Sequence, residues 1–185
     1  MPMNDTPRCP WCNRRNPLYV RYHDEEWGVL RTDDAYLVEM LILESFQAGL
    51  SWECILNKRE NFRRALDDFD PVKISRYDEE KLTALLADPG IVRNRLKLRA
   101  TVNNCAVLTD LIAEYGGFYR YLCTFTGGET LTETGRTTNA WSDAVSKDLY
   151  RRGLRFVGST IIYAWLQAIG VINSHEPGCA LYRGE

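Results

Sequence analysis

The sequence predicts an all-α fold, and two observations support this. Apolar side chains recur at spacings of three and four over most of the 185 residues, which is the period of a helix with one buried face. Alternating apolar and polar residues, the pattern of a half-buried strand, are scarce, and no pair of strands is convincing. Helices are expected at about residues 33–48, 52–66, 79–87, 93–114, 142–152 and 160–169.

Residues that commonly end helices stand at several of these boundaries. A Ser, Thr or Asp side chain can accept a hydrogen bond from the first turn, and glycine readily takes the left-handed conformation that follows the last turn. N-caps are expected at Thr32, Asp78 and Ser159. Left-handed residues are expected at Gly49, Gly116, Gly153 and Gly170, and a loop is expected over residues 127–135.

Composition indicates a single domain over residues 1–185, because hydrophobic residues make up 45% of the chain and can fill one core. Residues 1–31 are rich in Trp, Tyr and Cys and poor in helical periodicity, so we expect them to wrap over the helical core. No apolar run is long enough to cross a membrane, and no signal peptide is recognisable. A cytoplasmic location is therefore expected, where the six cysteines serve metal binding or burial rather than disulfides.

The net charge of −2 argues mildly against nucleic acid as a partner. Whole-chain charge decides little, however, because DNA meets a local surface. Residues 91–99 carry four cations and no acid. This run is either a solvated helix face or a patch for phosphates.

The two histidines of the chain stand near its two ends, and each has cysteines nearby. Cys9 and Cys12 precede His23, and Cys179 follows His175 by four positions. Two Cys and two His form a common structural zinc set, and four protein ligands leave no position for a catalytic water. The alternative is two buried histidines with structural thiols, and spacing alone does not distinguish this from a zinc site. Spacing also leaves open whether Cys9 or Cys12 is the ligand.

Glu44 is a carboxylate on the apolar face of its predicted helix. It follows Met40 by four positions and Leu41 by three, and no Lys or Arg stands three or four positions away. A buried carboxylate is costly unless it is paired or serves a function. Either a distant arginine pairs with it, or it awaits a cationic ligand.

Aromatic residues are dense in the same part of the sequence. Such rings more often fill a core than line a pocket, but the N-terminal segment is short for so many of them. Rings around a buried anion suit a flat cation, through stacking, cation–π attraction and charge pairing. The rings are Trp11, Tyr19, Tyr22, Trp27 and Trp52.

Several strings of this chain resemble the DNA-3-methyladenine glycosylase I family, from about residue 8 to residue 182. They are YHDEEWG at 22–28, ESFQAGLSW at 44–52, KREN at 58–61, FDP at 69–71, GIVRNR at 90–95 with Lys97, KDL at 147–149, FVGST at 156–160, and His175 with Cys179. The resemblance implies the helix-hairpin-helix glycosylase fold with a zinc clasp between the N- and C-terminal regions. The implied zinc ligands are Cys9, His23, His175 and Cys179. The implied base pocket has Glu44 as its catalytic residue with Tyr22 and Trp52, and Trp11 and Trp27 complete its wall.

The resemblance also implies contacts with double-stranded DNA that contains alkylated bases. A base inside a duplex must be extruded before an enzyme can reach it, and the loop of Gln47, Gly49 and Leu50 is placed to fill the gap. The hairpin residue Gly90 and the cations Arg93, Arg95 and Lys97 are expected to meet phosphates. The hairpin carries Val92 where many such hairpins have a second glycine, so a weaker grip on phosphate is expected.

The expected activity is hydrolysis of the N-glycosidic bond of N3-alkylated purines, which releases 3-methyladenine and initiates base excision repair. The positive charge of the alkylated base makes it a good leaving group, so Glu44 would serve recognition more than proton transfer. No lysine is placed as a nucleophile, so no strand cleavage is expected, and Asp110 is expected to be a solvated residue. The alternatives are a non-catalytic lesion-binding module of the same fold and a metal-dependent hydrolase. No heptad pattern indicates assembly, so a monomer is expected.

Overall fold

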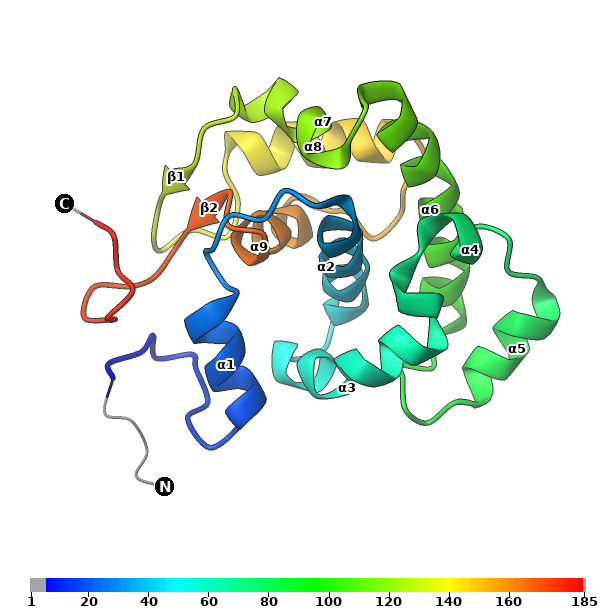
Figure 1. Cartoon of the computed structure of the whole chain (residues 1–185), viewed down its shortest axis with the longest axis horizontal. Coiled ribbons are helices and arrows are strands. Elements are labelled where there is room, and N and C mark those ends of the chain that lie inside the picture. The colour runs from blue at the N-terminus through cyan, green and yellow to red at the C-terminus, as the bar shows by residue number, and fades with distance from the viewer. Residues whose placement is uncertain (1–5, 185) are drawn as a thin grey trace.

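The computed structural model describes residues 6–184, and its regular elements are mostly helices (Figure 1). No helix among the described residues is long and apolar enough to span a membrane. The helices are α1 (Pro17–Glu25), α2 (Asp34–Gln47), α3 (Trp52–Ala65), the 3₁₀ turn η1 (Asp67–Phe69), α4 (Pro71–Ile74), α5 (Glu79–Ala87), α6 (Arg95–Tyr115), α7 (Phe118–Thr126), α8 (Ala140–Arg151) and α9 (Ser159–Ala168). Two short strands, β1 (Leu131–Thr132) and β2 (Ile172–Asn173), pair in parallel, with Leu131 opposite Ile172.

Each of the six predicted helices has a counterpart in α2, α3, α5, α6, α8 and α9. Asp78 caps α5 as expected, through a hydrogen bond from the Lys81 N–H. The cap of α2 is Asp33 rather than Thr32, and Ser159 lies inside α9 rather than before it. The four glycines expected to be left-handed all have positive φ, between 69° and 105°.

Helices α1, α4 and α7 and the strand pair were not predicted. Helix α1 lies within the N-terminal segment that is poor in helical periodicity, and it begins with Asn16 as N-cap and Pro17 in the first turn. Helix α7 is rich in aromatic residues, which are weaker helix formers, and its N-cap Gly117 has no side chain to cap it. Asp34 of α2 accepts a hydrogen bond from the Phe118 N–H instead. A tertiary contact therefore stabilises the start of α7.

Helix α2 is the central element of the fold (Figure 1). Every residue from Leu37 to Phe46 is buried, and α2 packs against α3, α6, α7 and α9. Because neighbours surround it on all sides, the polar residues of α2 become buried together with its apolar ones. Burial of Glu44 therefore follows from the position of the helix in the molecule.

The N-terminal segment packs against the C-terminal part of the chain. The Gly28 N–H donates to the Gln167 carbonyl at 3.0 Å, and the Ala180 N–H donates to the Pro7 carbonyl at 2.9 Å. Gly170 has φ +75°, and a Cβ there would lie 2.1 Å from the carbonyl carbon of Val29. Only glycine fits this close approach, which brings the two ends of the chain to one side of the molecule (Figure 1).

Candidate base pocket and metal cluster

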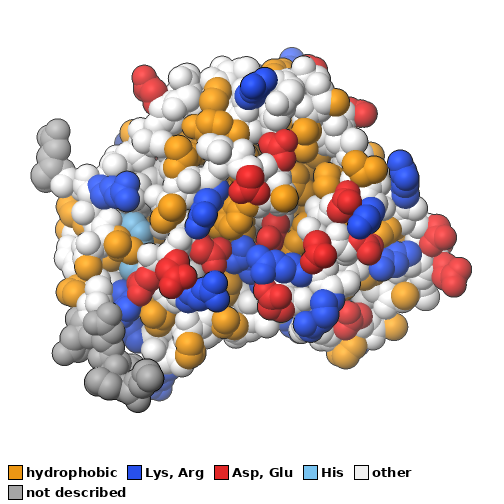
Figure 2. Space-filling model, viewed as in Figure 1, with side chains coloured by type: hydrophobic (Ala, Val, Ile, Leu, Met, Phe, Trp, Pro, Cys, Tyr) orange, Lys and Arg blue, Asp and Glu red, His pale blue; other side chains and the backbone are white. Residues whose placement is uncertain are grey.

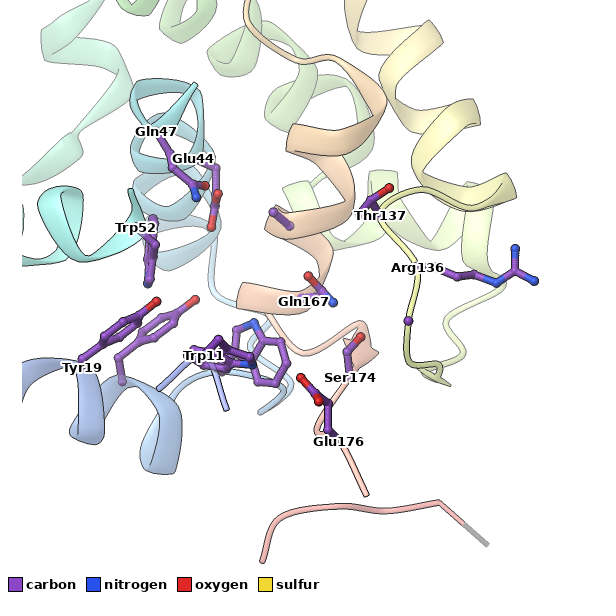
Figure 3. Close-up of a pocket in the computed structure, with 14 residues that line it drawn as sticks. Trp11, Tyr19, Glu44, Gln47, Trp52, Arg136, Thr137, Gln167, Ser174 and Glu176 are labelled. Atoms are coloured by element: carbon purple, nitrogen blue, oxygen red, sulfur yellow. The ribbon is translucent and has the colours of Figure 1, made fainter. Parts of the chain in front are cut away.

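A cavity of about 420 Å³ lies between the N-terminal segment, the ends of α2 and α3, and the C-terminal region. Figure 3 shows Glu44 and Gln47 descending from α2 toward the rings of Tyr19 and Trp52, whereas Arg136 points away from the cavity. The lining residues are Trp11, Tyr19, Tyr22, Trp27, Glu44, Gln47, Trp52, Gly135, Arg136, Thr137, Ala164, Gln167, Ser174 and Glu176.

The residues on one side of this cavity were predicted from the sequence, and those on the other side were not. The residues from Gly135 onward were not predicted, because they come from a loop, from α9 and from the segment after β2. They reach the cavity only through the packing of the C-terminal region against the N-terminal segment, for which the sequence holds no local signal.

Glu44 is a buried carboxyl group without a charged partner. The residue is 3% exposed, and its Oε2 atom is buried with no hydrogen-bond partner. None of the ion pairs among residues 6–184 involves it. Burial raises its pKa to about 8, because removal from water penalises the charged form. The distant arginine considered as an alternative is therefore absent from the described part of the chain.

Another buried carboxylate of α2, Glu39, is paired with arginine side chains. Arg59 donates to Glu39 at 2.6 Å and to Glu26, beside the end of α1, also at 2.6 Å. Arg63 donates a further hydrogen bond to Glu39 at 3.0 Å. This network joins the end of α1, α2 and α3, whereas no arginine among residues 6–184 pairs with Glu44, so the two buried carboxylates of α2 have different environments.

Two aromatic residues flank Glu44 in the cavity. Ser51 caps α3 by accepting a hydrogen bond from the Cys54 N–H, which places Trp52 in the first turn. The rings of Tyr22 and Trp52 have centroids 5.2 Å apart, and the Trp52 Nε1 atom is buried with no hydrogen-bond partner. Burial and the nearby Glu44 raise the pKa of Tyr22 well above its usual value. The pocket thus offers two rings, an unused N–H donor and an unpaired carboxyl group.

Behind the aromatic wall, Cys9, His23, His175 and Cys179 form a buried cluster whose ligand atoms all lie within 4.8 Å of one another. The Cys179 Sγ lies 3.5 Å from His23 Nε2 and 3.5 Å from His175 Nδ1. Zinc–sulfur and zinc–nitrogen bonds of about 2.3 and 2.05 Å at a tetrahedral centre place S and N about 3.6 Å apart. The donor set and its spacing therefore fit a tetrahedral metal ion.

Cys12 is not part of this cluster. Its Sγ lies 3.9 Å from the Tyr19 carbonyl oxygen, so the structure favours Cys9 where spacing left the two open. The outer nitrogens of both histidines also have acceptors. His23 Nδ1 lies 2.8 Å from an Asp24 carboxylate oxygen, and His175 Nε2 lies 3.1 Å from the Trp27 carbonyl. Such bonds fix the histidine tautomer that presents the other nitrogen to a metal.

The cluster and the pocket share a wall. The Trp27 ring lies edge-on to the His175 ring at 4.7 Å and to the Trp11 ring at 4.6 Å. Because Trp11 and Trp27 also line the cavity, the cluster fixes one side of the pocket as well as the two ends of the chain.

The loop between α2 and α3 stands at the mouth of the pocket. Gln47 lines the cavity, Gly49 has φ +81° with open space where a Cβ would stand, and Leu50 is 41% exposed. The Leu50 N–H donates to the Gln47 carbonyl at 2.6 Å. The loop is thus a tight turn that presents a leucine to solvent.

The hairpin of α5 and α6 carries the predicted phosphate-binding residues, which differ in their exposure and in their hydrogen-bond or ion-pair partners. Gly90 lies in the connecting loop, where Lys58 and Asn61 donate to its carbonyl at 3.3 and 3.2 Å. Arg93 is exposed, and Arg95 lies 3.9 Å from Glu79. Figure 2 shows acidic and basic side chains mixed across the face that it draws, not a field of one sign.

Lys97, which was expected to contact DNA, is a buried residue in this structure. The residue is 7% exposed, and its ammonium group donates to the carbonyls of Phe46 and Ala48 at 2.7 and 2.6 Å. Both carbonyls lie at the C-terminal end of α2, where helix carbonyls lack partners. A direct bond to phosphate would require this ammonium group to leave them. Asp110 is exposed, as expected.

Comparisons with known proteins agree with this geometry. A family model described as methyladenine glycosylase matches residues 11–182. DNA-3-methyladenine glycosylase 1 of Escherichia coli strain K12 is 43% identical over 184 residues, which cover 96% of this chain and 97% of that protein. A crystal structure of 3-methyladenine DNA glycosylase I superposes with a TM-score of 0.90 at 39% identity, covering 95% of this chain and all of that one. A variant of 3-methyladenine DNA glycosylase I in complex with 3-methyladenine superposes with a TM-score of 0.86 at 31% identity, covering 90% and 92%. The chain therefore belongs to the methyladenine glycosylase family.

Proposed function

We propose that the protein is a DNA-3-methyladenine glycosylase, which hydrolyses the N-glycosidic bond of N3-alkylated purines in double-stranded DNA. The observation that carries this proposal is the unpaired Glu44 carboxyl group in an aromatic pocket. A relative that is 43% identical bears the name of this activity, and a similar protein has been solved with 3-methyladenine.

The damaged nucleotide rotates out of the duplex, and its base enters the cavity beside the rings of Tyr22 and Trp52. An N3-alkylated purine nucleotide is a cation, so it supplies the charge that Glu44 lacks. Because the pKa of Glu44 is raised to about 8 in the empty pocket, the carboxyl group is mostly protonated at neutral pH and loses its proton as the cation binds. A neutral adenine leaves the buried group without this partner, which costs about 1–3 kcal/mol.

The chemical step needs little from the protein. The bond between C1′ and the base nitrogen breaks with its electron pair going to the base, which leaves as neutral 3-methyladenine. Water adds to the electron-poor C1′ and loses a proton, which gives an abasic site. No lysine among residues 6–184 lines the cavity, so this part of the chain offers no amine nucleophile there, and the protein is proposed to leave the DNA strand intact.

We assign Zn²⁺ to Cys9, His23, His175 and Cys179 as a structural ion. All four ligands come from the protein, so the ion would have no open position for water. The bound ion would neutralise the thiolates and join residue 9 to residue 179. Its role in the proposal is to support the pocket wall rather than to activate water.

For DNA, we propose that Gln47, Gly49 and Leu50 enter the gap that the extruded base leaves. The hairpin of α5 and α6 would act as a helix-hairpin-helix element, with Gly90, Arg93 and Arg95 near the phosphates. Residues 1–185 would form one domain that works as a monomer in the cytoplasm, and size-exclusion chromatography checks the oligomeric state.

The test is an assay of base release. The full-length protein is incubated with N3-methylated duplex DNA, and free bases are separated by chromatography. Release of 3-methyladenine with intact strands supports the proposal. Tight binding to the methylated duplex without any released base would make the protein a lesion-binding module instead.

A further inference from the structure

Phe156 has a strained backbone that burial does not explain. Its φ is +57°, a conformation that costs a bulky residue about 1–3 kcal/mol. Phe69 is the other aromatic residue with positive φ within residues 6–184, and it is 1% exposed. Burial of its ring offsets the strain. Phe156, by contrast, is 37% exposed.

Three surrounding elements hold this strained backbone in place. The Ser45 hydroxyl of α2 lies 3.1 Å from the Phe156 carbonyl oxygen and 2.8 Å from the Leu41 carbonyl oxygen, and these two acceptors share its single proton. Asn104 of α6 exchanges two hydrogen bonds, of 2.8 and 2.9 Å, with the backbone of the preceding residue. Ser146 of α8 donates to the carbonyl of the following residue at 2.7 Å. A backbone fixed this way presents an aromatic side chain to solvent in one orientation.

The position of this ring is set relative to the α2–α3 loop. The Lys97 ammonium group lies 5.9 Å from the centre of the Phe156 ring and donates to the Ala48 carbonyl at 2.6 Å. Ser45, which holds the Phe156 backbone, adjoins Glu44 of the base pocket. Phe156 and the exposed Leu50 therefore stand on two loops that Lys97 connects at the C-terminal end of α2.

We call a side chain that enters the gap left by the extruded nucleotide a wedge, and Leu50 is the first one proposed. We propose that Phe156 is a second wedge, which stacks its ring on a base left unstacked when the damaged nucleotide is extruded. This inference rests on the proposed function. A flat ring stacks on any base, so the contact would serve lesions in every sequence context.

The test compares single-turnover base release from a methylated duplex and from the same methylated strand alone. Phe156→Ala should slow release from the duplex about tenfold or more, which is within the range of one lost base–aromatic stack. The single strand has no gap between paired bases, so its release should slow much less. Phe156→Tyr, which keeps the flat ring, should restore the duplex rate. Tyr182→Ala is the matched control, because Tyr182 is 36% exposed and does not line the pocket.

Binding of free 3-methyladenine separates a folding defect from a lost wedge, and it should be unchanged in Phe156→Ala. If that variant does not fold, Phe156→Leu keeps apolar volume without the flat ring and should show the same selective loss. A full duplex rate for the folded variant, or equal losses on both substrates, would overturn the proposal. Absence of release by the unmodified protein would instead refute the proposed function on which the wedge rests.

Discussion

Replacement of Glu44 by Gln should stabilise the protein at alkaline pH and leave its stability unchanged at acidic pH. Folding raises the pKa of Glu44 from 4.5 to about 8, so the folded state retains a proton that the unfolded state has lost. The stability that this group contributes is fully present below pH 4.5 and is lost as the pH rises through about 8. One pKa unit corresponds to about 1.4 kcal/mol. The difference of three to four units predicts a gain of roughly 4–6 kcal/mol for the variant at pH 9.

The assay is urea unfolding of the unmodified protein and of Glu44→Gln, at pH 5 and at pH 9. The stability difference between the two proteins should grow by a few kcal/mol between these pH values. Glu129→Gln is the control, because it removes the same charge from an exposed position and should show little change. A difference for Glu44→Gln that stays constant with pH would refute the account of an unpaired, buried carboxyl group.

Two further perturbations address the supports of the pocket. Cys179→Ser should lower the bound zinc and the melting temperature, because it removes one ligand of the proposed ion, whereas Cys12→Ser should change neither. Metal analysis and thermal unfolding check both variants. Equal zinc loss in the two variants would refute the assignment. Arg59→Met should destabilise the protein by about 3 kcal/mol, since it removes the arginine that pairs with Glu26 and one of the two arginines that pair with the buried Glu39. Chemical unfolding at neutral pH measures this loss, and a change below about 1 kcal/mol would show that the network contributes little.

The sequence predicted the long helices and one side of the site because those features are local. The period of apolar residues identified α2 and α6, and the lack of a neighbouring cation identified Glu44. Helix α7 was missed because Asp34, distant in sequence, caps it. Burial of Lys97 was missed because its partners, the last carbonyls of α2, become available only after the two helices pack.

The same distinction explains the strain at Phe156 and the far wall of the cavity. A positive φ at a phenylalanine has no signature in composition or periodicity, since contacts from three other elements impose it. Residues such as Gln167 join the pocket only where the C-terminal region meets the N-terminal segment. Chemistry carried by residue type could thus be read from the sequence, and chemistry created by packing could not.

The central claim is that an unpaired carboxyl group among aromatic rings selects a methylated purine, and calorimetric binding of free bases tests it most directly. The unmodified protein should bind the 3,9-dimethyladeninium cation, which keeps the charge of the alkylated nucleotide, at least about tenfold more tightly than neutral 9-methyladenine, since an unsatisfied buried group costs about 1–3 kcal/mol. Glu44→Gln should lose most of this preference. Equal affinity for the two bases, or an undiminished preference in the variant, would contradict the account.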